Sequence, residues 1–273
     1  MLSGRDEAGR IAYALHLGGR HLPLEDRIGR PFALRFTGAR TCLCCGRRVR
    51  KFYGQGLCYP CLRDAPEASA CIVRPELCRA HLGEGRDPQW ERDHHLQEHF
   101  VYLAQTGAAA LDPAVRGGIK VGVTRSTQVP TRWIDQGAVL AVLIARVPYR
   151  QLAGAIEVDL KRIFTDRTDW RAMLRQVSAD PSALVAARAL AIATVEPALR
   201  PYMLHEEEPL LLDYPLRSTL PRVASISLEA TPEVRGTLIG VKGQYLLFGD
   251  GRVLNIRNHS GFHVDEEIFS DPM

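Results

Sequence analysis

Residues 119–138 read IKVGVTRSTQVPTRWIDQGA, and this stretch decides how the middle of the chain is interpreted. It begins as an apolar strand, passes through a basic turn, and ends on side chains that can bind or catalyse. These are Arg132, Trp133, Asp135 and Gln136. Because a lysine, two arginines and an aspartate gather around one short strand, we treat the stretch as part of a candidate site.

The segments on either side predict a small mixed domain over residues 100–200. Apolar runs at 100–104 and 138–147 predict two further strands, and residues 150–165 show the apolar spacing of a helix. Asp180 followed by proline predicts the start of another helix, with the aspartate as its N-cap. Strand, strand, short helix, strand and helix therefore follow one another in this domain.

The two ends of the chain predict β structure. Apolar residues alternate over 11–17 and 32–37. After Pro201 the pattern is again that of strands, and the Gly-Asp-Gly turn at 249–251 predicts a hairpin. We expect a small β-barrel or sheet there. The predicted class is α+β, with N-terminal strands and a zinc-binding region at 1–99, the central domain at 100–200 and a β domain at 201–273.

Composition narrows the class of protein. The chain has 273 residues and a formal net charge of +4, enough length for two or three modest domains. No apolar run approaches the roughly 18 residues of a membrane span, and the first ten residues lack the apolar core of a secretory signal. We therefore expect a cytoplasmic protein with no membrane partner. The sequence leaves its oligomeric state open.

All seven cysteines lie between Cys42 and Cys78. In a cytosolic chain such a cluster indicates metal binding and not disulfides. Two Cys-x-x-Cys pairs separated by twelve residues predict one tetrahedral, structural Zn²⁺ site. Its ligands are Cys42, Cys45, Cys58 and Cys61. Buried thiols without a metal are the alternative, and Cys44 is left over as a free thiol or a substitute ligand.

The remaining cysteines predict a second zinc site. Cys71 and Cys78 are followed by several histidines, from which we take His81 and His95 as the other two ligands, with His94 as the alternative to His95. Ordinary buried thiols beside solvated histidines fit the same pattern. His99, just before the strand at 100–104, fits either a ligand or an active-site residue.

A basic segment lies between the two cysteine pairs and is followed by Phe52 and Tyr53. A basic hairpin tip with aromatic residues is typical of a nucleic-acid contact, and a solvated tip is the alternative. Arg125, in the basic turn of 119–138, joins the tip among the residues predicted to bind DNA or RNA. The tip consists of Arg47, Arg48, Arg50 and Lys51.

Four short motifs follow one another over residues 100–164. Phe-Val-Tyr ends at Tyr102, Lys-Val-Gly begins at Lys120, Arg132 stands on the next predicted helix, and Glu157 stands on a later one. In order and spacing these motifs resemble the GIY-YIG nuclease superfamily. Tyr102 resembles the tyrosine of its first strand, and Lys120 the position where some branches carry lysine. Arg132 resembles its invariant arginine, and Glu157 its metal-binding glutamate.

The resemblance implies a phosphodiesterase that acts on DNA or RNA with Mg²⁺ or Mn²⁺. Glu157 would hold the ion and Arg132 would fork onto the phosphate. Tyr102 would orient or deprotonate the water, and Lys120 would stabilise charge. The chain departs from the pattern by an insertion at 107–118 and by the lack of a clear asparagine after Glu157.

Each of these residues also has an ordinary structural explanation. Tyr102 fits a core residue, and Lys120 fits the edge of a sheet. Arg132 and Asp135 fit a helical ion pair, as do Glu157 and Lys161.

Two other functions fit the same residues, because a fold does not fix a reaction. The first is a non-catalytic nucleic-acid-binding protein, in which Glu157 pairs with Lys161 or Arg132. The second is a small-ligand enzyme that uses Arg132, Asp135 and Gln136. Nearly the whole chain is also similar to a bacterial family catalogued only as a domain of unknown function. That similarity rests on the cysteine pairs followed by the K-V-G-x-T-R…R-W-I-D-Q-G-A signature, and it implies no activity.

Overall fold

The structure is a computed structural model that describes residues 1–110, 117–175 and 177–267. The predicted insertion at 107–118 therefore lies partly outside the described residues. The chain folds into two compact units. The terminal unit comprises residues 1–62, 174–176 and 213–273, and the central unit comprises 63–173 and 177–212. The predicted α+β class is confirmed, but the predicted ranges 1–99 and 201–273 group differently, because both ends of the chain share one unit.

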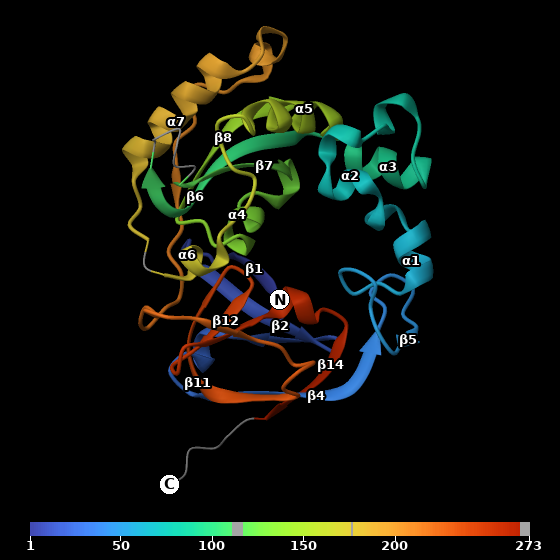
Figure 1. The fold of residues 1–273 in the computed structure, drawn as a ribbon, viewed down its shortest axis with the longest axis vertical. Coiled ribbons are helices and arrows are strands. Elements are labelled where there is room, and N and C mark those ends of the chain that lie inside the picture. The colour runs from blue at the N-terminus through green and yellow to red at the C-terminus, as the bar shows by residue number, and fades with distance from the viewer. Residues whose placement is uncertain (111–116, 176, 268–273) are drawn as a thin grey trace. The chain divides into compact units, whose positions relative to one another are not determined.

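The largest sheet of the terminal unit joins the two ends of the chain (Figure 1). β4 (Pro31–Thr41) pairs antiparallel with β11 (Glu233–Lys242) on one side and with β14 (Phe262–Glu267) on the other. The strand order is β10-β13-β12-β11-β4-β14. Of the predicted barrel or sheet, the structure therefore has a sheet, and an N-terminal strand completes it.

Shorter strands complete this unit. The hairpin predicted at 249–251 joins β12 to β13, and Gly251 adopts the φ of +88° that such a turn requires. β5 pairs with the end of β4, and the first three strands form a separate antiparallel sheet. The bounds are β1 Leu2–Arg5, β2 Ile11–Leu17, β3 Arg20–Pro23, β5 Arg48–Val49, β10 Ala224–Ile226, β12 Tyr245–Phe248 and β13 Arg252–Asn255.

The central unit is built on an antiparallel sheet with the order β7-β6-β8-β9. α4 lies between β7 and β8 in the chain, and α5 and α7 pack on the sheet (Figure 1). Branched and aliphatic side chains from these elements form one buried core. The bounds are β6 His99–Ala110, β7 Gly117–Arg125, β8 Leu140–Val147, β9 Leu210–Leu211, α4 Thr131–Asp135, α5 Arg150–Leu160, α6 Trp170–Leu174 and α7 Pro181–Thr194.

Residues 59–95, which precede β6, fold into short helices joined by 3-10 turns. The α-helices are α1 (Tyr59–Asp64), α2 (Ala70–Val73) and α3 (Pro88–His95). The 3-10 turns of the chain are η1 Glu25–Arg27, η2 Pro66–Ala68, η3 Pro75–Leu77, η4 Ala80–Leu82, η5 Ser126–Gln128, η6 Pro197–Tyr202 and η7 Ile256–His259. Among the described helices, none has the length and apolar character needed to cross a membrane.

The turn η3 packs tightly against α5. A Cβ atom placed on Gly154 would lie 2.2 Å from the backbone nitrogen of Glu76, so only glycine allows the two backbones to approach this closely. The helical region that follows the first cysteines is thereby fixed against the helix that carries Glu157.

Candidate metal centres and a buried polar site

The first cysteine centre lies in the terminal unit. The sulfurs of Cys42, Cys45, Cys58 and Cys61 all lie within 4.8 Å of one another. A tight turn after Cys42 brings the first pair together, with Gly46 at a φ of +69° and its N–H donating to the Cys42 carbonyl oxygen over 3.0 Å. The structure therefore brings together the four predicted ligands, and Cys44 stays exposed.

The ionisation of the cysteine thiols and the backbone N–H groups that donate to them favour a metal at this centre. Burial raises the pKa of Cys42, but the backbone N–H groups of Cys45 and Cys58 outweigh it and bring that pKa to about 6. Hydrogen bonding with the Cys58 sulfur raises the pKa of Cys61. Four sulfurs so close together can all be thiolates only beside a cation, and four thiolates in a tetrahedron are a preferred zinc environment.

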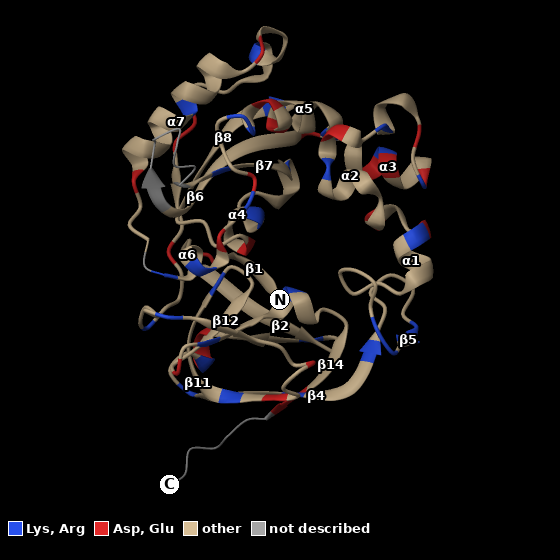
Figure 2. Ribbon diagram, in the orientation of Figure 1, with Lys and Arg blue, Asp and Glu red and all other residues tan. Residues whose placement is uncertain are grey.

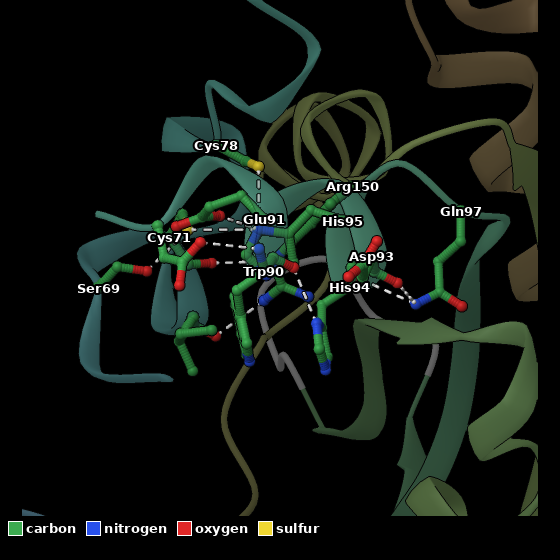
Figure 3. Close-up of polar contacts among 12 residues, drawn as sticks. Ser69, Cys71, Cys78, Trp90, Glu91, Asp93, His94, His95, Gln97 and Arg150 are labelled. Carbon is green, nitrogen blue, oxygen red and sulfur yellow. Dashed lines mark hydrogen bonds and ion pairs between the residues drawn. The ribbon is translucent and has the colours of Figure 1, made fainter. Parts of the chain in front are cut away.

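The second centre lies in the central unit and is buried (Figure 3). One ligand atom from each of Cys71, Cys78, Glu91 and His95 lies within 4.8 Å of the others. The Nδ1 atom of His95 lies 3.4 Å from the Cys78 sulfur and 3.9 Å from the Cys71 sulfur, and it contacts the Glu91 carboxylate. Glu91 and His95 are four residues apart on α3, so both face the cysteines.

The electrostatics of this centre also fit a divalent cation. Hydrogen bonding with Cys78 lowers the pKa of Cys71 to about 4 and raises that of Cys78, so the pair shares one proton. Arg150 of α5 donates to the carbonyl oxygens of Cys71 and Ile72, over 3.0 and 2.9 Å. Its positive charge would offset the surplus negative charge that two thiolates and a carboxylate would leave beside Zn²⁺. Sulfur, nitrogen and oxygen donors together suit zinc.

The predicted ligand set is corrected at one position. His81 stacks on Tyr149, with ring centroids 5.1 Å apart, and Glu91 takes the fourth place in the group. His94 stacks on Trp90 and its Nδ1 atom bonds the Trp90 carbonyl oxygen, so His95 is the histidine of the site. The spacing Glu-x-x-x-His on a helix capped by Asp87 was the available sequence signal for Glu91.

His99 lies outside this ligand group. Its side chain is fully buried at the start of β6, and its Nδ1 atom lies 2.7 Å from the Gln97 carbonyl oxygen. Burial lowers its pKa to about 4, so the imidazole is neutral at physiological pH. Its position within the sheet is that of a neutral core histidine.

A third cluster unites the four residues predicted from the nuclease-like motifs. Tyr102 and Lys120 lie on the neighbouring strands β6 and β7, Arg132 on α4 and Glu157 on α5. The charges of Arg132 and Glu157 act on the ionisation of both Tyr102 and Lys120, so the four side chains lie within electrostatic range of one another. We call this cluster the buried polar site.

The tyrosine of this site depends on the glycine opposite it. Tyr102 pairs with Gly122 across the two strands, and a Cβ atom on Gly122 would lie 2.5 Å from the Tyr102 hydroxyl oxygen. The phenol ring therefore lies across the glycine, which explains the Lys-Val-Gly motif. The Tyr102 hydroxyl donates to the Oε1 atom of Gln136 over 2.9 Å.

Burial shifts the pKa of three ionisable groups at the site. It raises the pKa of Tyr102, although the nearby Arg132 opposes the shift. It lowers the pKa of Lys120 to about 8, and the positive charge of Arg132 adds to this effect. Burial also raises the pKa of Glu157, with Lys161 opposing. Such shifts in one place are typical of functional sites.

Glu157 has a cationic neighbour on its own helix. The Lys161 Nζ atom lies 3.4 Å from the Glu157 carboxylate and 3.1 Å from the carboxylate of Asp166. Thr165 forms an isolated β-bridge with the backbone of Lys120. The Lys120 Nζ atom lies 3.4 Å from the Thr168 hydroxyl. The structure thus contains both the predicted cluster and the predicted Glu157–Lys161 pair. Asp166 is a neighbour that the sequence interpretation missed.

The residues predicted to contact nucleic acid are divided between the two units. Arg47, Arg48, Arg50 and Lys51 are exposed around β5 in the terminal unit, where Figure 2 shows basic residues gathered. Arg125 ends β7 in the central unit and is half-buried opposite His99. We therefore consider the basic tip without Arg125.

A family model with the description "Protein of unknown function (DUF2797)" matches residues 29–264. The matched range contains both cysteine centres and the buried polar site. No curated protein and no solved structure matches the chain.

Proposed function

The chain belongs to the DUF2797 family, whose description is a protein of unknown function, and from its buried polar site we propose a divalent-metal-dependent phosphodiesterase that acts on DNA or RNA. The observation that carries the proposal is the convergence of Tyr102, Lys120, Arg132 and Glu157 from four different elements. Burying the ionisable side chains of Tyr102, Lys120 and Glu157 costs free energy, and shifted ionisable groups of this kind concentrate at functional sites. The carrying elements are also those that the resemblance to GIY-YIG nucleases implies.

The proposed roles follow from charge and geometry. Arg132 would fork onto the non-bridging oxygens of the phosphate. Lys120, with a pKa of about 8, carries a positive charge at neutral pH and would stabilise the charge that develops on the phosphate. Tyr102 is a neutral phenol because its pKa is raised, so it would orient the attacking water by a hydrogen bond and not remove its proton.

Glu157 is the group that fits a hard divalent ion. Mg²⁺ is commonly held by one or two carboxylates together with water and substrate phosphate, and Asp166 supplies a second carboxylate nearby. When bound, such an ion neutralises phosphate charge and activates water. Lys161 would have to leave Glu157 first, and its side chain is 30% exposed, which gives it room to turn into solvent.

A second candidate is a nucleic-acid-binding protein without catalysis. It is favoured by the ion pairs of Lys161 with Glu157 and Asp166, which satisfy both carboxylates without a metal. Lys120 and Arg132 would then bind phosphate only. A small-ligand enzyme that uses Gln136 has less support, because Gln136 accepts the Tyr102 hydrogen bond.

The test is cleavage of labelled single- and double-stranded DNA and RNA with Mg²⁺ or Mn²⁺. Glu157→Gln and Arg132→Ala are each expected to lower the rate by about 100-fold or more, because each removes charge that acts on the phosphate. Glu208→Gln, at an exposed position, is the matched control and should cut like the wild type. Cleavage that survives both substitutions would overturn the proposal. Binding without any cleavage would establish the second candidate.

The pH dependence tests the role of Lys120 separately. Its charged form is lost as pH rises through about 8, so cleavage should fall over that range. In Lys120→Arg the guanidinium stays protonated, and the fall should move to higher pH. An unchanged alkaline limb in this variant would exclude Lys120 as the group that titrates.

A further inference from the structure

A groove lies beside the four-cysteine centre, within the terminal unit. It separates the loop 52–56 from the turn η7, and its cavity has a volume of about 680 Å³. Both aromatic and polar side chains line it. Those used below are Phe52, Tyr53, Gln55, Arg257 and Asn258.

The aromatic wall of the groove is exposed to water. Tyr53 is 50% exposed, and it is braced by Tyr59, whose ring meets it edge-on with centroids 5.4 Å apart. The Nζ atom of Lys51 lies 4.7 Å from the centre of the Tyr53 ring. A braced, half-exposed ring beside a cation is the arrangement on which nucleobases stack in single-strand binding proteins.

The loop 52–56, which carries both Tyr53 and Gln55, is strained. Gln55 has a φ of +41°, and among the described residues it alone combines a positive φ with a side chain. The left-handed conformation costs about 1–2 kcal/mol for such a residue, and this kind of strain concentrates at binding sites. The amides of Gln55 and Asn258 each offer a donor and an acceptor, which matches the edges of bases.

The cysteine centre and the large sheet hold the two walls in place. The Tyr53 N–H donates to Leu57 over 3.0 Å, and the next residue is the ligand Cys58. On the other side, the Thr41 N–H donates to Gly261 over 2.8 Å, just beyond η7. A groove fixed in this way needs little ordering on binding, which favours affinity.

The charge around the groove favours a polyanion. Residues 27–63 carry nine basic side chains and no acidic one, and four of the nine pair with carboxylates from outside this range. In the part of the chain that the structure describes, the exposed Arg47, Arg48 and Arg50 side chains make no ion pair. Their charge is therefore available to a phosphate backbone. The basic residues are Arg27, Arg30, Arg35, Arg40, Arg47, Arg48, Arg50, Lys51 and Arg63.

We propose that this groove binds single-stranded nucleic acid, with a base stacked on Tyr53, its edge met by Gln55 and Asn258, and the backbone held by Arg257. A single strand is the fitting form, because the faces of bases in a duplex are already covered by their neighbours. The inference rests on the proposed function for the class of substrate and narrows it to unpaired strands. Binding in the groove does not require Glu157.

The test measures fluorescence anisotropy of labelled short single strands and the matching duplexes, with the Glu157→Gln protein and no added Mg²⁺. Single strands should bind more tightly than duplexes. Tyr53→Ala should weaken single-strand binding by about tenfold, because one base–aromatic stack is lost, whereas Tyr53→Phe should bind almost like its parent. Arg257→Ala should weaken binding and reduce its salt dependence. Arg200→Ala, at an exposed position of the central unit, is the charge-matched control.

Equal affinity for single strands and duplexes would overturn the inference, as would normal binding by Tyr53→Ala. The zinc content of each variant is measured in parallel, and Tyr53→Phe reports on the groove if Tyr53→Ala fails to fold. If the wild type cleaves nucleic acid but Tyr53→Ala binds single strands normally, this inference is overturned and the phosphodiesterase proposal stands. If single-strand binding depends on Tyr53 but the wild type does not cleave, this inference stands and the phosphodiesterase proposal is overturned.

Discussion

The two cysteine centres differ in how their ligands are brought together. The centre in the terminal unit takes four cysteine sulfurs from the turns of residues 42–61, and it leaves Cys45 exposed. The centre in the central unit takes its ligands from three short segments, and none of them is more than 7% exposed. One is a local and partly exposed structure, and the other is fully buried.

This difference determines how much of the fold should be affected when a centre loses a ligand. A centre made of two Cys-x-x-Cys turns needs little from the rest of the fold. The mixed centre depends on Arg150, which reaches the carbonyl oxygen of Cys71 from α5, and on the close contact of Gly154 with η3. Because α5 also carries Glu157, the second centre is linked to the buried polar site, whereas the first is linked to the groove.

The largest expected difference concerns stability. Cys78→Ser should lose one of two zinc ions and lower the Tm by about 10 °C, because it leaves the buried Glu91 and His95 without their cation. Cys58→Ser should lose the other zinc ion with a clearly smaller change in Tm. Metal analysis and thermal unfolding followed by circular dichroism give both values. Equal losses of Tm in the two variants would remove the distinction between a local and a core centre.

The same pair of variants should separate catalysis from binding. Cys78→Ser is expected to lower kcat by about 100-fold, since a small displacement of α5 misplaces Glu157. Cys58→Ser should mainly raise KM, by about tenfold, because the groove loses its preformed wall. Steady-state cleavage of single strands at a temperature where both variants are folded measures the two constants. If Cys58→Ser lowered kcat instead, the first centre would also act on the catalytic step and not on substrate binding alone.

The sequence was sufficient for the centre whose geometry is local. Two Cys-x-x-Cys pairs at a fixed spacing leave few arrangements, and the hairpin at 249–251 is indicated by its glycines.

The sequence was insufficient where the partners are distant or chemically common. Glu91 is one of many glutamates, and only the fold shows that it displaces His81 from the ligand set. The pairing of β4 with β11 joins residues about 200 positions apart, which no local pattern encodes. Asp166 was missed for a similar reason, since it meets Lys161 through the turn after α5.

Two glycines allow a finer comparison of the centres. A Cβ atom on Gly85 would lie 2.4 Å from the Cγ atom of Glu91, whereas one on Gly46 would meet nothing within 4 Å. Gly85→Ala should therefore displace a ligand and lower zinc affinity at the second centre by about tenfold. Gly46→Ala should cost only about 1 kcal/mol of stability, through its positive φ. Competition with a zinc chelator and urea unfolding measure the two effects. A first centre more sensitive than the second would contradict the comparison.

The smallest expected effect comes from a single hydrogen bond. The Ser69 hydroxyl oxygen lies 3.1 Å from the Cys71 sulfur, and the corresponding donor at the first centre is the backbone N–H of Cys58, 3.3 Å from Cys42. Ser69→Ala should weaken zinc binding at the second centre about two- to tenfold, because one donor to the thiolate is lost. The first centre of the same molecule is the internal control in a two-phase chelator titration, since no side-chain substitution removes its backbone donor. A change in zinc release from the first centre alone, or an equal change at both centres, would show that Ser69 does not act through Cys71.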